Sequence, residues 1–174
     1  MKLLLIVASL AIPALACGQS ATTCPMLAQH QEAADPHAAG VDARGDHAMG
    51  FPHDKSAHHF RLYPDGGAIE VGANDPSDTV TRDEIRAHLN HIVQLFTAGD
   101  FHVPMFIHDT VPPGVSVMES KRGAIVYAFE ATQDGGRVRM TTADAEALKA
   151  VHQFLEFQIE DHRTGDPKMV APGH

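Results

Sequence analysis

The chain has 174 residues, of which 44% are hydrophobic, and carries a formal net charge of −9. This length predicts one folded domain with room for a targeting segment, and the hydrophobic fraction is sufficient for a core. The negative charge argues against nucleic acid or an anionic membrane surface as a partner. Histidine is the unusual residue, because its 13 copies equal lysine and arginine combined.

The first 16 residues have the layout of a signal peptide. Lys2 supplies a positive charge, residues 3–12 are almost entirely apolar, and Ala14 and Ala16 form a small-x-small cleavage site. The apolar run is too short to cross a bilayer as a helix. We therefore expect an exported protein, either in the periplasm or anchored by a lipid to a bacterial membrane.

Cys17 directly follows the expected cleavage site and is the candidate for lipidation, although bacterial lipoboxes usually have leucine where Ala14 stands. If Cys17 carries a lipid, Cys24 is left without a partner. If it does not, the two cysteines can form a short-loop disulfide in an oxidising compartment. The sequence leaves both alternatives open.

Residues 17–57 are rich in Ala, Gly, Asp, Pro and His and contain few large apolar residues. No helical or strand periodicity persists there, so we predict a flexible tether. A solvated linker is the favoured interpretation. The alternative is weak metal capture by the histidines of this segment, which are His30, His37, His47 and His53.

We predict one folded domain over residues 58–166, followed by a disordered tail over 167–174. At its start, residues 59–63 and 68–72 alternate around a Pro-Asp-Gly-Gly turn, which is typical of a β-hairpin. Apolar residues then recur at helical spacing over residues 82–98.

The same pattern returns in the second half. Residues 124–129 and 137–141 predict strands around an Asp-Gly-Gly turn, and a helix follows from Thr142. The proline-rich segment 101–117 predicts mostly irregular structure. We therefore expect an α+β fold from a duplicated ββα unit, with one antiparallel sheet and two helices packed on one face. The alternative is that hairpins and helices recur without duplication.

Helical periodicity places several histidines near the core. At about 100° per residue, His152 lies about 40° from Leu148 and His162 about 40° to the other side, within the apolar stripe of the second helix. His88 lies at the margin of the first stripe, about 60° from Ile85. Such a histidine needs partners for its nitrogens, because an unpaired buried polar group costs about 1–3 kcal/mol.

Other histidines come from outside the helices. His58 and His59 begin the first strand and point to opposite faces, and the neighbouring composition favours His58 as the inward one. His108 precedes Asp109, a carboxylate that could orient its ring. We predict a transition-metal site, for copper or zinc rather than calcium or magnesium. Its candidate ligands are His58, His59, His88, His108 and His152.

The expected function is a carrier, buffer or sensor of that metal, with a metal ion or small ligand as its partner. One alternative is a metal-free binding or structural module in which hydrogen bonds satisfy the histidines, and another is a small periplasmic metal-dependent enzyme. Haem is a further alternative, and the absence of Cys-x-x-Cys-His excludes covalent c-type attachment. No Gly-x-Ser-x-Gly, phosphate-binding loop or His-Glu-x-x-His is present, and a homodimer is left open.

The expected domain also resembles a family of uncharacterised bacterial exported proteins, over nearly its whole length. Members are sometimes labelled aspartate carbamoyltransferase, but the Ser-Thr-Arg-Thr phosphate-binding run of that enzyme is missing here. The resemblance implies a family without implying a reaction. The runs that carry it are His-His-Phe at 58–60, Gly-Gly at 66–67, Ile-Arg-Ala-His-Leu at 85–89, Gly-Asp-Phe at 99–101, Pro-Pro-Gly-Val at 112–115 and Phe-Gln-Ile-Glu-Asp-His-Arg-Thr-Gly-Asp at 157–166.

Overall fold

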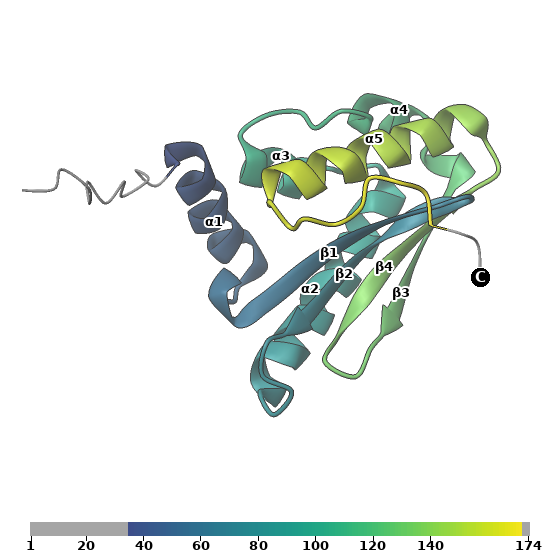
Figure 1. The fold of residues 1–174 in the computed structure, drawn as a ribbon. Helices are drawn as coiled ribbons and strands as arrows, with labels where there is room; N and C mark the ends of the chain where they lie inside the picture. The colour runs from purple at the N-terminus through teal and green to yellow at the C-terminus, as the bar shows by residue number, and fades with distance from the viewer. Residues whose placement is uncertain (1–34, 172–174) are drawn as a thin grey trace, which may run out of the picture. The chain divides into compact units, whose positions relative to one another are not determined.

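The computed structural model describes residues 35–171, which form helices packed against one sheet (Figure 1). The predicted signal peptide, Cys17 and Cys24 lie outside these residues. In chain order the described elements are α1 (Pro36–Met49), a short 3-10 helix (His53–Lys55), β1 (Ser56–Tyr63), β2 (Gly66–Ala73), α2 (Thr79–Ala98), α3 (His102–His108), α4 (Val115–Ser120), a second 3-10 helix (Arg122–Ala124), β3 (Ile125–Ala131), β4 (Gly135–Thr142) and α5 (Ala145–Asp161).

The four strands form one antiparallel sheet in the order β1-β2-β4-β3. Each predicted hairpin is therefore present, and the central pair β2–β4 joins the two halves. Gly66 opens β2 and pairs with Thr141, the seventh residue of β4, while Gly135 opens β4 and pairs with Gly72, the seventh residue of β2. This register relates the hairpins by an approximate two-fold axis, as a duplicated ββα unit requires.

The Gly-Gly pairs at 66–67 and 135–136 do not form the hairpin turns that their sequence context predicts. The structure instead places both pairs at the starts of β2 and β4, the two central strands through which the halves of the sheet meet. A Cβ on Gly66 would lie 2.0 Å from the carbonyl oxygen of Met140, and one on Gly135 would lie 2.1 Å from that of Val71. The close approach of the central strands thus leaves no room for a side chain.

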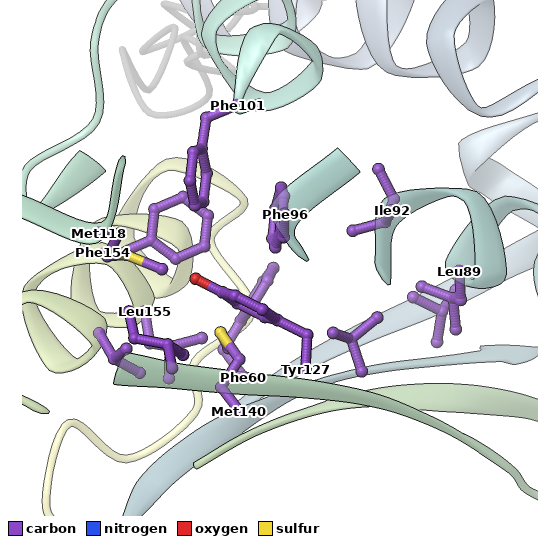
Figure 2. Close-up of a cluster of buried hydrophobic side chains, with 14 of the residues drawn as sticks. Phe60, Leu89, Ile92, Phe96, Phe101, Met118, Tyr127, Met140, Phe154 and Leu155 are labelled. Atoms are coloured by element: carbon purple, nitrogen blue, oxygen red, sulfur yellow. The ribbon is translucent and has the colours of Figure 1, made fainter. Parts of the chain in front are cut away.

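The helices α2 and α5 pack on the same face of the sheet, as expected for this fold class, with α2 mainly over β3 and β4 and α5 mainly over β1 and β2. Their apolar stripes meet the inward side chains of the strands in one core, of which Figure 2 shows the central part. The hydroxyl of Tyr127 points into this core and finds no hydrogen-bond partner among the described residues. Its core neighbours include Phe96, which meets the tyrosine ring edge-on at a centroid distance of 5.7 Å.

The predicted tether is wrong from residue 36 onward, because α1 is a folded helix with buried Ala38 and Val41. Its start is capped by the Asp35 side chain, which accepts a hydrogen bond from the backbone N–H of His37 at 3.0 Å. The helix packs on α3, where the Arg44 side chain donates to the carbonyl oxygen of Ile107 at 2.7 Å. This tertiary packing, rather than an apolar period of its own, stabilises the helix.

The middle segment is also more regular than predicted, since α3 and α4 occupy much of residues 102–120. Pro104 does not prevent α3 because it is the third residue of the helix. Its missing N–H is one of those that have no partner within a helix in any case.

The segment from residue 162 to residue 171 has no regular secondary structure, but hydrogen bonds attach it to β1. The Asp166 carboxylate accepts from the backbone N–H of Phe60 at 3.0 Å, and the N–H of Ala171 donates to the carbonyl oxygen of Leu62 at 2.8 Å. Of the predicted disordered tail, the part that the structure describes is therefore bonded to β1 at Ala171. Within residues 35–171, no helix has the length and apolar character needed to cross a membrane.

We expect Gly135→Ala to lower the free energy of unfolding by roughly 2–4 kcal/mol, because the added methyl group would collide with the backbone of β2. Chemical denaturation measures this loss. Gly123→Ala is the matched control, since a Cβ there meets nothing within 4 Å. Equal stability of the two variants would contradict the close β2–β4 contact.

Candidate functional site

A pocket of about 70 Å³ lies where the inner face of the sheet meets α1, α2, α3 and α5. Its polar lining consists of four histidines and one glutamine: His58, His88, His108, His162 and Gln158. The rest is mainly hydrocarbon. It includes five of the core side chains labelled in Figure 2, namely Phe60, Leu89, Ile92, Phe96 and Phe154.

His58 comes from the start of β1 and faces the helices, as strand alternation predicts. It shares the inner face of the sheet with Phe60 and Leu62, both of which are 2% exposed. Its ring is parallel to that of His162, with an angle of 3° between the planes and 5.6 Å between the centroids.

His162 directly follows the last residue of α5. Its ring also stacks on Phe60 at a centroid distance of 5.5 Å and meets His108 at 4.9 Å, nearly perpendicular. Periodicity correctly placed His162 on the apolar side of α5. The predicted ligand set does not include His162, so the structure adds it to the pocket lining.

His88 lies on α2 and brings a third partly buried imidazole to the pocket. Its ring meets Phe51 edge-on at a centroid distance of 6.0 Å. Phe51 follows α1 and is 2% exposed. The segment predicted to be a tether therefore helps to enclose this histidine.

Burial keeps three of these imidazoles neutral. It lowers the pKa of His58 to about 4, with a further contribution from the neighbouring His88. It likewise lowers the pKa of His88 to about 4 and that of His162 to about 3, the latter with help from His58 and His108. At neutral pH each of these rings therefore carries one N–H donor and one unprotonated nitrogen.

His108 has a different role, because both of its ring nitrogens are already engaged. Nδ1 contacts the Asp161 carboxylate, and Nε2 lies 2.8 Å from Gln158 Oε1. Asp161, rather than the expected Asp109, thus orients this ring, which is 1% exposed. On α1, Nε2 of His37 lies 2.7 Å from the second oxygen of Asp161.

The Asp161 carboxylate remains ionised in this partly buried position. Burial by itself raises the pKa of Asp161, but hydrogen bonds from His108 and His37, together with their charges, outweigh it and hold the pKa below its usual value. Asp161 therefore links a surface histidine on α1 to the buried His108 at the wall of the pocket.

Two of the predicted ligands lie elsewhere. His59 points to the opposite face of the sheet, where Nδ1 lies 3.1 Å from the Asp166 carboxylate. His152 places Nε2 2.9 Å from the carbonyl oxygens of both Tyr63 and Gly66, so it fastens α5 to the β1–β2 turn. The structure therefore brings together His58, His88 and His108 from the predicted set, and not His59 or His152.

The ring nitrogens of His58, His88 and His162 make no hydrogen bond with any residue of the described part of the chain, unlike those of His108 and His152. As the side chains lie, no three His, Cys, Asp or Glu residues between 35 and 171 are arranged to coordinate a metal ion. The pocket is thus lined by imidazole nitrogens that have no hydrogen-bond partner in the described residues, but these nitrogens are not arranged around a common point.

Comparison of the chain with models of protein families, with curated proteins and with solved structures gives no match. The resemblance to a family of uncharacterised exported proteins therefore stays a prediction.

We expect acid to destabilise the protein between pH 7 and pH 5 through His58, His88 and His162. Because their folded pKa values lie below the unfolded value of 6.5, the unfolded chain binds more protons in this range and stability falls with pH. The loss is about 1–2 kcal/mol for each histidine, measurable by denaturation at several pH values.

His162→Gln should flatten this pH dependence, while replacement of the exposed His91 by Gln should leave it unchanged. The lowered pKa of Asp161 and of Asp166 adds a separate loss only at lower pH, below the usual carboxylate range. Equal stability at pH 5 and pH 7 would refute the assignment of buried neutral imidazoles.

Proposed function

We propose that the protein binds a transition-metal ion, copper or zinc, in the histidine-lined pocket through His58, His88 and His162. One observation carries this proposal: three neutral imidazoles from separate elements face the same small pocket, and none is hydrogen bonded within residues 35–171. Their nitrogens are not among the buried unpaired atoms, so an entering ligand can reach them without breaking a bond to the protein.

The chemistry of the donors suits copper and zinc. The neutral imidazole is the form that binds a metal, so ligands with a low pKa lose little affinity to protons at neutral pH. Nitrogen donors in an apolar pocket do not suit calcium or magnesium, which take oxygen ligands. The thioether of Met49 also lines the pocket and favours copper of the two candidates, because sulfur is a soft ligand.

Binding would require the side chains to rearrange. Two imidazoles on one tetrahedral ion have centroids about 5 Å apart when each metal–nitrogen bond is about 2.0–2.1 Å. The 5.6 Å between His58 and His162 is close to this separation, but their parallel rings do not direct their nitrogens to a common point. The proposal therefore needs rotation about the side-chain torsions of these histidines.

A metal carrier, buffer or sensor is the role that fits this site within an exported protein. The second candidate is a metal-free module that binds a small neutral molecule. The hydrocarbon lining, including Phe60 and Phe154, favours it, with the imidazoles as hydrogen-bonding groups. An enzyme would require an open coordination position as well.

Metal titration of the full chain, purified without a histidine tag, distinguishes these candidates. We expect about one tightly bound equivalent of copper or zinc per chain, measured by elemental analysis and competition with a chromogenic chelator. Alanine at His58, His88 or His162 should each weaken binding roughly tenfold or more, because each removes a ligand.

His91→Ala is the matched control, because His91 lies exposed on α2. Circular dichroism establishes that each variant is folded. Absence of metal at micromolar concentrations, or full affinity in a variant that lacks all three histidines, would overturn the proposal. The metal-free binding module would then be the leading candidate.

A further inference from the structure

The two edges of the sheet, β1 and β3, occupy equivalent positions in the two-fold register but differ in what covers them (Figure 1). At the edge of β1, the segment after α5 bonds to the outward backbone groups. The N–H of Phe60 donates to the Asp166 carboxylate, and the carbonyl oxygen of Leu62 accepts from the N–H of Ala171. The chain itself therefore covers one edge of its sheet.

The edge of β3 has no such cover within residues 35–171. Its hairpin closes where the N–H of Thr132 donates to the carbonyl oxygen of Gly135 at 3.1 Å. Alternation along an antiparallel pair then directs the N–H and carbonyl groups of Tyr127, Phe129 and Ala131 away from β4. These groups have no hydrogen-bond partner among the described residues. We call this row of backbone groups the open edge.

The side chains beside the open edge favour pairing with another strand. Val126 is 64% exposed and points to the face of the sheet opposite the helices, as does the exposed Ala128. Natural edge strands are usually protected from pairing by lysine, proline or a bulge. Residues 125–131 contain neither lysine nor proline, and their register with β4 is continuous.

The charges at the two ends of β3 complement each other when the strand pairs with itself. Arg122 lies exposed just before β3 and forms no salt bridge with the described residues. Glu130 lies near the other end, where Oε2 pairs with Arg137 at 2.6 Å and Oε1 keeps no partner within residues 35–171. Antiparallel pairing reverses the order of the charges, so each Arg122 comes to lie beside Glu130 of the second copy.

We propose that the open edge is a dimer interface, at which β3 pairs antiparallel with β3 of a second copy of this chain. The two four-stranded sheets then form one continuous sheet across a two-fold axis. Position 126 is midway between 122 and 130, so the charge pairing places the two exposed Val126 side chains opposite each other. None of these residues lines the histidine pocket, so the interface is independent of metal binding.

Sedimentation velocity of the full chain measures the association. The net charge of −9 opposes it, so the buffer contains salt at about 0.15 M, which screens charges farther apart than about 8 Å. We expect a dimer for the wild-type protein. Val126→Lys should raise the dimer dissociation constant roughly tenfold or more, because it places two like charges opposite each other at the axis. Val111→Lys is the control, since Val111 is also 52% exposed but lies outside the sheet.

Disulfide cross-linking tests the register. The N–H and carbonyl groups of Val126 face β4, so the two copies of this residue form a non-hydrogen-bonded pair with Cα atoms about 4.5 Å apart, which suits a disulfide. In a chain with Cys17→Ser and Cys24→Ser, we expect Val126→Cys to cross-link on mild oxidation. Val111→Cys should remain largely uncross-linked.

Circular dichroism establishes that each variant is folded. A wild-type protein that stays monomeric at roughly 100 μM would overturn the proposal. Dimerisation of Val126→Lys with the wild-type dissociation constant would place any interface elsewhere and would overturn it as well. Equal cross-linking of the two cysteine variants would contradict pairing through β3.

Discussion

The antiparallel pairing of β2 with β4 is the contact on which the other parts of the structure depend. Each hairpin has one apolar face, and neither half could bury that face alone. The central pair places both faces side by side, so that α2 and α5 can cover them together. Close approach of the two strands excludes side chains at Gly66 and Gly135. The sheet edge, the core and the pocket all take their positions from this pair.

The pocket has a lining of mainly hydrocarbon, in which a few imidazoles make no hydrogen bond to the described part of the chain. Two other histidines of the domain are paired within the protein: His152 with the carbonyl oxygens of a turn, and His108 with Asp161 and Gln158. The contrast with His58, His88 and His162 singles out these three. Burial lowers the pKa of all three, so each is a neutral imidazole at neutral pH.

The amino-acid pattern predicted the two hairpins, the two long helices and the inward direction of His58, since periodicities of 2 and 3.6 residues determine these features locally. The periodicity of a helix predicts the direction in which a side chain points from the helix axis. It does not predict which part of the protein lies opposite that side chain. His152 and His162 share the apolar side of α5, yet one meets a hairpin turn and the other the pocket. The helix α1 could not be predicted because its stability comes from packing on α3, a contact between segments about 60 residues apart in the chain.

The two-fold register of the sheet also pairs His58 with a counterpart. His58 lies opposite Val71 in the first hairpin, and the equivalent position of the second hairpin is Tyr127, opposite Met140. One copy thus carries an imidazole that faces a pocket, and the other a phenol enclosed by hydrocarbon. The same position in the two halves therefore fills the core in one and borders an unfilled space in the other.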